Sequence, residues 1–190
     1  MTTTTIFGSG TMGSAIAGIV GQGDNQVQVL GRDDTARISG DVVVLAVPYG
    51  EVAGILEARR DQLAGKVVVD ITNPVNFETF DSLTVPADSS AAAVIAEALP
   101  EATVVKAFNT TFGGTLVAKE VGPLPTTVLI AGDDADAKSL VTEVIEAGGL
   151  TVIDAGGLKR ARELEALGFL QITLAAGEKV SWTGGFGVVR

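Results

Sequence analysis

The sequence contains no cysteine and no histidine among its 190 residues. The lack of thiols excludes disulfides, thiolate zinc sites and cysteine nucleophiles, and the lack of imidazole excludes Ser-His-Asp triads and histidine proton shuttles. Positive charge is also scarce, because 13 Lys and Arg stand against 23 Asp and Glu, a formal net charge of -10. Nucleic-acid affinity comes from basic groups that displace counterions, so we expect no nucleic-acid partner.

Long apolar runs are missing as well. No uninterrupted run approaches the roughly 18 to 20 residues of a membrane helix, and residues 1–5 lack the basic and apolar parts of a signal peptide. We therefore expect a cytoplasmic protein with no membrane partner. The acidic residues within 133–136 precede a predicted helix, where capping and the helix dipole explain them, so we expect no metal site.

What the sequence does have is the size and composition of one α/β domain, with 46% apolar residues and 24 glycines. Short β-branched runs alternate with segments of helical period, which is typical of parallel strands joined by crossover helices. The predicted strands are Thr3–Phe7, Gln26–Leu30, Val42–Val47, Lys66–Ile71, Thr103–Phe108, Thr126–Ala131 and Thr151–Asp154. The predicted helices are Met12–Gly21, Gly50–Leu63, Ser89–Leu99, Ala135–Ala147 and Leu158–Glu178. This pattern predicts a Rossmann-like, doubly wound, mostly parallel sheet with a C-terminal helix.

A glycine-rich turn follows the first strand and opens the first helix, with the sequence Gly8-Ser9-Gly10-Thr11-Met12-Gly13. It matches the dinucleotide-binding fingerprint in the strand-turn-helix context that the mechanism requires. Gly8 would form the tight turn, Gly10 would let the backbone approach a pyrophosphate, and Gly13 would let the helix pack close to the strand. The helix N-terminus then offers free amides to the phosphates. The alternative is a purely structural glycine turn.

The end of the second strand indicates which nucleotide binds. An NAD site places a carboxylate there to bind the ribose 2′-hydroxyl, whereas this sequence has Gly31 and Arg32. Arg32 can pair with a 2′-phosphate and lay its guanidinium on the adenine, which favours NADP. The alternative is a solvated turn residue that pairs with Asp33 or Asp34.

The region between the second and third predicted strands is unusually short. Only eight residues separate Arg32 from Asp41, too few for the helix, third strand and return helix of a complete mononucleotide half. Because that third strand lies at the edge of the sheet, we expect a smaller sheet that is not broken. The adenine side of the site should be poorly walled.

Three further segments lie at carboxyl ends of predicted strands, where ligands of a doubly wound sheet bind. The candidate cofactor residues in them are Ala46, Val47, Pro48, Tyr49, Asn73, Pro74, Asn109 and Thr110. Each has a structural alternative, since Asn73 and Asn109 can tie down loops and the neighbouring Lys106 can be an edge or salt-bridge residue. Phenylalanines 77, 80, 108 and 112 are expected to pack in the core or a lid.

The last predicted helix is apolar nearly all round between Leu164 and Leu174, so we expect it to be buried in the fold or in a dimer interface. A homodimer is the expected partner state, with Trp182 and Phe186 near the acceptor site or the interface. The alternative is a helix at the centre of a monomeric core. Gly168 within it suggests close approach of another backbone or of a flat ring. The turn 154–157 before the helix either presents amides to an acceptor or only turns the chain.

Four segments carry a family resemblance: Ile6–Gly13, Ala46–Pro48, Lys106–Thr110 and Asp154–Leu158, which leads into the last helix. Their order and spacing resemble the F420-dependent NADP oxidoreductases and the small bacterial dinucleotide-binding oxidoreductases grouped with them. The resemblance implies an NADP-binding Rossmann domain over residues 1–155. It also implies a C-terminal helical extension over 156–190, packed on the same core or on a dimer partner.

The resemblance further implies hydride transfer between NADP(H) and a flat redox coenzyme, the deazaflavin F420 or a flavin. Such a protein mainly holds two rings face to face, so no catalytic side chain is required. One alternative is an NADPH-dependent reductase of a small carbonyl or imine, with Lys106 or Tyr49 as proton donor. Another is a non-catalytic dinucleotide-binding module.

Overall fold

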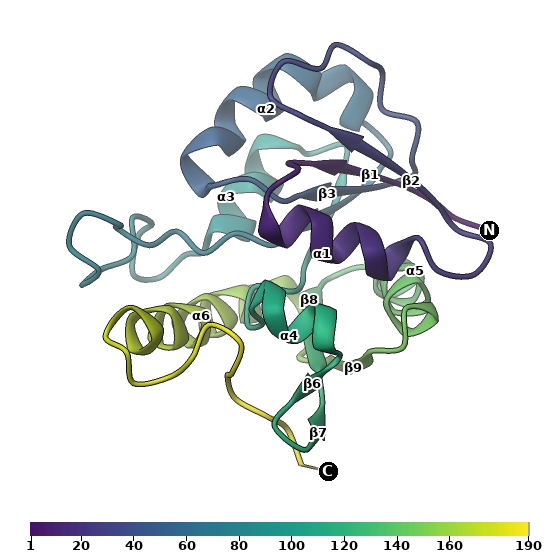
Figure 1. Ribbon diagram of the computed structural model, residues 1–190. Coiled ribbons are helices and arrows are strands. Elements are labelled where there is room, and N and C mark those ends of the chain that lie inside the picture. Colours follow the sequence, from purple (N-terminus) through teal and green to yellow (C-terminus); the bar gives the residue numbers. More distant parts are fainter. Residues whose placement is uncertain (190) are drawn as a thin grey trace.

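The computed structural model describes residues 1–189 and is shown in Figure 1. Its helices and strands are, in chain order, β1 (Thr3–Phe7), α1 (Thr11–Val20), β2 (Gln26–Leu30), β3 (Val42–Leu45), α2 (Tyr49–Leu63), β4 (Val67–Asp70), α3 (Ala91–Ala98), β5 (Thr103–Lys106), α4 (Gly113–Ala118), β6 (Glu120–Val121), β7 (Leu124–Pro125), β8 (Thr127–Gly132), α5 (Ala135–Ala147), β9 (Thr151–Asp154), the 3-10 helix η1 (Leu158–Arg160) and α6 (Ala161–Ala176). Within this described part of the chain, no helix is both long and apolar enough to cross a membrane.

Seven strands form one sheet in the order β2-β1-β3-β4-β5-β8-β9, which confirms the predicted Rossmann-like, mostly parallel architecture. Strands β1 to β5 all run parallel. The strand order reverses at β1, because β2 pairs with one of its edges and β3 with the other. Ligands of such sheets bind in the crevice beyond the carboxyl ends of the strands at this reversal. The turns that follow β1 and β3 are therefore where a site is expected.

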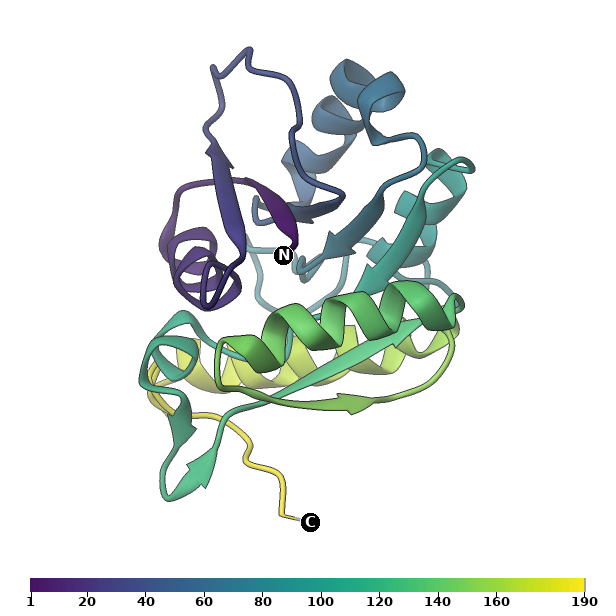
Figure 2. The ribbon, with the colours of Figure 1, turned by 90° about the vertical axis from the view of Figure 1, so that its right-hand side faces the viewer.

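The region between β2 and β3 contains neither helix nor strand in the described structure. Residues 31–41 form a loop that arches away from the sheet at the top of Figure 2. Strand β2 is consequently an edge strand, with β1 as its neighbour. The prediction of a smaller but unbroken sheet is confirmed.

The last two strands of the sheet differ from the predicted parallel pattern. Strands β8 and β9 are parallel to each other, but β8 pairs antiparallel with β5. The connection from β5 to β8 allows this reversal, because it contains the short helix α4 and the β6–β7 hairpin instead of a full crossover helix. A helix of six residues and strands of two residues are too short to show a period, so the sequence did not predict them.

Helices cover both faces of the sheet (Figures 1 and 2). One core cluster joins apolar side chains of α1, α4 and α5 to the sheet, and a second cluster contains those of α2 and α3. Strand β3 contributes to both clusters in alternation, because Val42 and Val44 belong to the first cluster and Val43 and Leu45 to the second. Burial of alternate side chains on both faces explains why this strand is a continuous apolar run in the sequence.

Helix α6 is apolar nearly all round in the sequence, but only one of its faces is buried. Its buried residues are Ala161, Leu164, Glu165, Gly168, Gln171 and Ala175. Leu170 is 49% exposed, and Phe169 and Ile172 are half-buried. The alternative of a fully buried central helix is therefore wrong, and the helix keeps apolar side chains on its open side.

Gly168 is a point of close contact between α6 and the segments that follow β4 and β5. A Cβ atom added there would lie 2.4 Å from Asn73 Oδ1 and 2.8 Å from the backbone oxygen of Asn109. Both distances are far below van der Waals contact. The predicted close approach of another backbone at this glycine is confirmed, and it docks α6 against the carboxyl ends of β4 and β5.

This contact gives a prediction for stability. Gly168→Ala should lower the free energy of unfolding by about 1 to 3 kcal/mol, the usual cost of overpacking, although alanine favours a helix more than glycine does. The matched control is Gly18→Ala in α1, where an added Cβ meets nothing within 4 Å among the described residues. That variant should gain stability. Urea unfolding measures both, and equal effects of the two substitutions would contradict the close-contact explanation.

Candidate functional site

A cavity of about 600 Å³ opens where the strand order reverses. Its walls are the turn after β1, the segments after β2 and β3, and one face of α2. The predicted cofactor residues on these walls are Gly8, Ser9, Gly10, Gly31, Arg32, Ala46, Val47 and Pro48. The other predicted residues lie outside this lining in the described chain: Thr11, Met12, Gly13, Tyr49, Asn73, Pro74, Asn109 and Thr110. The structure thus brings the first half of the fingerprint turn together with Gly31, Arg32 and the segment after β3, while the residues after β4 and β5 lie apart from this cavity.

The glycine-rich turn has the geometry that the fingerprint requires. Gly8 has a φ angle of +110°, and an added Cβ would lie 2.2 Å from the backbone oxygen of Ala46. A Cβ on Gly13 would lie 2.0 Å from the oxygen of Gly8, so both glycines are needed for close packing. Gly10 is different, because an added Cβ there meets nothing within 4 Å in the described structure. The space beside Gly10 is open, and α1 begins at Thr11 without a side-chain cap among residues 1–189.

Arg32 extends from the end of β2 at the wall of the cavity. Its partner is neither Asp33 nor Asp34 but Glu51 of α2, with 3.0 Å between Nη2 and Oε1. The two side chains are 77% and 48% exposed, and such surface ion pairs contribute little free energy. The Asp34 carboxylate instead accepts a hydrogen bond from the Gly31 amide at 2.6 Å. Arg32 can therefore leave Glu51 for a stronger anionic partner at little cost.

One face of α2 forms a wall of the cavity that is absent from the residues predicted from sequence. Its cavity residues are Glu51, Gly54, Ile55, Ala58 and Arg59. Spacings of three and four residues place these side chains on the same side of a helix. The signal available in the sequence was the pair of small residues at 54 and 58, which leave room beside the helix.

The strand-end amides Asn73 and Asn109 bind each other and α6. Asn73 donates through Nδ2 to the Asn109 oxygen at 2.8 Å, and Asn109 donates to Asn73 Oδ1 at 3.0 Å and to the Leu164 oxygen at 2.8 Å. In the described structure Asn109 Oδ1 is buried without a hydrogen-bond partner. The amides therefore tie the two strand ends to α6, as their structural alternative predicts.

Phe108 explains why β5 ends two residues earlier than predicted. It has a φ angle of +60°, a conformation that is strained for a bulky residue, and it is buried in the first core cluster. The Thr111 hydroxyl donates to its carbonyl oxygen at 2.7 Å and helps to hold this conformation. The strained residue turns the chain, so that Asn109 faces Asn73 instead of continuing the strand.

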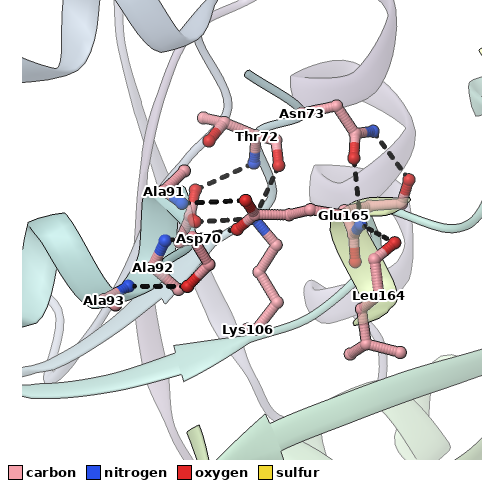
Figure 3. Close-up of polar contacts among 11 residues, drawn as sticks. Asp70, Thr72, Asn73, Ala91, Ala92, Ala93, Lys106, Leu164 and Glu165 are labelled. Atoms are coloured by element: carbon pink, nitrogen blue, oxygen red, sulfur yellow. Dashed lines mark hydrogen bonds and ion pairs between the residues drawn. The ribbon is translucent and has the colours of Figure 1, made fainter. Parts of the chain in front are cut away.

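Lys106 lies at the end of β5 in a buried ion network, shown in Figure 3. Its Nζ atom is 2.7 Å from Asp70 Oδ2, 2.8 Å from Glu165 Oε1 and 2.6 Å from the Thr72 carbonyl oxygen. The Lys106 side chain has no exposed surface. Lys106 is therefore the salt-bridge residue of its structural alternative, and its ammonium group does not reach the cavity.

Glu165 also caps the N-terminus of α3 (Figure 3). Its carboxylate accepts hydrogen bonds from the amides of Ala91 and Ala92 at 2.8 and 3.2 Å. Burial raises the pKa of Glu165, while Lys106 and the Ala91 amide act in the opposite direction. The sequence carries no signal for this role of Glu165, because Glu165 lies 59 residues from Lys106 and no local pattern joins the two.

Tyr49 lies half-buried at the start of α2. Burial raises the pKa of its phenol, and the negative charges of Glu165 and Asp70 raise it further. The phenol therefore keeps its proton at neutral pH and is a hydrogen-bond donor there.

Aromatic side chains separate into two groups. Phe108 and Phe112 are buried, whereas Phe77 and Phe80 are exposed on the long loop between β4 and α3 that projects at the left of Figure 1. Phe112 also contacts Trp182, with 5.0 Å between the ring centres. Trp182 is 52% exposed and belongs to the segment after α6, which returns to the start of α4.

The turn between β9 and η1 uses its amides internally. The Gly156 amide donates to Asp154 Oδ1 and the Leu158 amide to Asp133 Oδ1, both at 2.8 Å. These two amides are therefore occupied by carboxylates, which supports the interpretation that this segment turns the chain.

The buried Glu165 gives a prediction for pH dependence. Because its folded-state pKa lies above the ordinary value of 4.5, the folded protein binds more protons than the unfolded chain between the two values. The free energy of unfolding should therefore fall as the pH rises through this window. Glu165→Gln should remove this part of the fall. Urea unfolding of both proteins at a series of pH values measures it, and parallel curves would show that the carboxyl does not titrate in this way.

Comparisons with known proteins place the chain in a family. The family model described as "NADP oxidoreductase coenzyme F420-dependent" matches residues 27–74. An F420-dependent NADP reductase of Methanocaldococcus jannaschii is 32% identical over 159 residues, which are 82% of this chain and 70% of that protein. That of Methanothermobacter thermautotrophicus is 34% identical over 178 residues, 90% of this chain and 75% of that protein.

A solved structure agrees with these relatives. A candidate F420-dependent NADP-reductase from Arthrobacter sp. FB24 superposes with a TM-score of 0.84 and 26% identity, and the match covers 100% of both chains. The similarity to this structure spans the sheet, α6 and the segment after it. The fold, the fingerprint turn and the extent of these matches lead to one conclusion: the chain belongs to the family of the F420-dependent NADP reductases.

Proposed function

We propose that this protein is an oxidoreductase that transfers a hydride between NADP(H) and the deazaflavin F420. The observation that carries the proposal is the cavity in which the fingerprint turn and Arg32 meet, in a chain 32–34% identical to F420-dependent NADP reductases. A small carbonyl or imine as acceptor, and a module without activity, lack support from these relatives.

The lining of the cavity supports a nucleotide site through its amides and Arg32. The pyrophosphate would lie beside Gly10, where the backbone is open and the N-terminus of α1 supplies amides and a positive dipole end. Arg32 would exchange Glu51 for the 2′-phosphate, since a phosphate offers it a more highly charged partner. The adenosine would lie against Gly54 and Ala58 of α2.

The strand ends would then position the reacting rings. When bound, NADPH supplies the hydride that the deazaflavin accepts. Residues Ala46–Pro48 line the cavity after β3, and the next strands of the sheet are β4 and β5. Beyond the ends of those two strands, Asn73 and Asn109 are held by each other and by α6. Amides held in this way would favour hydride transfer by proximity and orientation, a mechanism that needs no histidine or cysteine.

The two binding roles are proposed for two successive parts of the chain. Residues 1–155 would bind NADP, and residues 156–190 would cover the acceptor side through α6 and Trp182. The half-exposed apolar side chains Leu170, Trp182 and Phe186 are the proposed contact surface of a homodimer. A cytoplasmic location stays a prediction from the sequence.

The activity is tested by following the absorbance of reduced nicotinamide with F420, a flavin and small carbonyl or imine acceptors. F420 should be reduced fastest, and NADPH should be preferred to NADH.

Arg32→Ala should raise the KM for NADPH about tenfold, ~1.4 kcal/mol, with little change for NADH. Gly10→Val should abolish binding of both nucleotides in a folded protein, because its side chain enters the open space beside Gly10. Equal use of NADH would overturn the NADP assignment, and turnover of only a small carbonyl or imine would overturn F420.

The homodimer is tested by sedimentation equilibrium. The protein should show about twice the chain mass of 19.3 kDa at micromolar concentration. Leu170→Lys should shift the equilibrium toward the monomer, because a charge replaces a half-exposed apolar side chain. A mass near 19.3 kDa at high concentration would exclude the dimer.

A further inference from the structure

The loop between β2 and β3 is held mainly by polar side chains from its surroundings. Residues 32–37 are exposed, whereas Ile38 is partly buried against the second core cluster. The Ile38 amide donates to Gln62 Oε1 at 3.0 Å, and Gln28 donates to the Arg37 oxygen at 2.9 Å. A loop without its own helix or strand takes its shape from such contacts. The side chains that bind the loop backbone therefore determine the position of the loop beside the cavity.

Arg59 of α2 joins this loop to the cavity. Its Nη1 atom donates to the Ala36 oxygen at 2.9 Å, and its Nη2 atom donates to the Asp34 oxygen. Its guanidinium carbon lies 6.0 Å from the ring centre of Phe7 at the end of β1. Both Arg59 and Phe7 line the cavity, as do Asp34 and Thr35 of the loop. One side chain thus connects α2, β1 and the loop at the same wall.

We propose that Arg59 is a positioning residue of the nucleotide site, which holds residues 34–36 in place as the outer wall of the cavity. Its hydrogen bonds fix the loop backbone between β2 and β3, where the described structure has no helix or strand to do so. The inference rests on the proposed function, because it takes the cavity to be the nucleotide site.

Arg59 also determines the position of Arg32 through the backbone. The Asp34 carbonyl accepts from Arg59, while the Asp34 carboxylate accepts from the Gly31 amide at 2.6 Å. This second bond closes the turn 31–34 that carries Arg32. With Asp34 held in this way, its carboxylate stays on the Gly31 amide, and Arg32 lines the cavity beside its partner Glu51.

The planar fork of arginine is the property that matters here. It spans two carbonyl oxygens in a fixed geometry, whereas the ammonium group of lysine is a point charge on a flexible stem. Arg59→Lys therefore keeps the charge and loses the fork, and Arg59→Ala loses both. The matched control is Arg60→Ala, because Arg60 is the next residue of α2, donates to the Ala98 oxygen at 2.6 Å and stands outside the described cavity lining.

Calorimetry with NADPH and NADH, together with steady-state kinetics, tests the proposal. Both Arg59 variants should bind either nucleotide about tenfold more weakly, the effect of losing one or two hydrogen bonds to a charged donor. The kcat at saturating NADPH should stay unchanged, and Arg60→Ala should behave as the wild type. Wild-type affinity in both Arg59 variants would overturn the proposal. Loss in Arg59→Ala with full retention in Arg59→Lys would also overturn it, since Arg59 would then act through its charge.

Hydrogen exchange without nucleotide separates positioning from a general loss of stability. The amides of Gly31 and Ile38 should exchange faster in Arg59→Lys than in the wild type, while the core strands keep their protection. Unchanged exchange at these two amides would contradict the role of Arg59 in holding the loop. A wild-type protein that binds no NADPH would instead overturn the proposed function, and the exchange result would still decide the role of Arg59.

Discussion

The buried ammonium group of Lys106 connects the N-terminal sheet to the C-terminal helix. It binds Asp70 at the end of β4 and Glu165 on α6, and none of the three side chains is more than 1% exposed. One cation and two carboxylates leave an excess negative charge, which the N-terminus of α3 offsets with two amides and its positive dipole end. Breaking such a pair by removing one partner costs about 3 to 5 kcal/mol, because the remaining charge is buried and unpaired. The position of α6 therefore depends on this network.

The geometry of the two strand-end amides follows from that position. With Glu165 bound to Lys106, the adjacent Leu164 carbonyl meets Asn109, and Gly168 lies one turn further along against Asn73. The strained Phe108 presents Asn109 to this contact. Three distant parts of the chain, the segments after β4 and β5 and one turn of α6, thus determine the geometry of two amides. A rigid arrangement of this kind is what a reaction driven by orientation requires.

The cavity proposed for the nucleotide is built differently. Its glycine turn depends on neighbours along the chain and on β3, and two of its glycines are in contact with backbone atoms, so its shape has little freedom. The opposite wall lacks the usual helix and strand and is an exposed loop held by side chains of α2, β1 and β2. The cavity therefore combines a rigid wall with one whose position depends on a few hydrogen bonds.

The sequence by itself determined the features that depend on local patterns. Alternating apolar runs and helical periods predict β1 to β5, α1 to α3 and α5, and the spacing of Gly8, Gly10 and Gly13 predicts the turn and its place after β1. Only the tertiary structure decided the direction of β8 and β9, the buried face of α6, and the partners of Lys106 and Arg32. The physical reason is how far apart in the sequence the interacting residues lie. Periodicity and turn conformation are set by adjacent residues, whereas a charge or an amide takes the partner that the folded chain brings within hydrogen-bond distance. Glu165 lies 59 residues from Lys106, and no local pattern contains that separation.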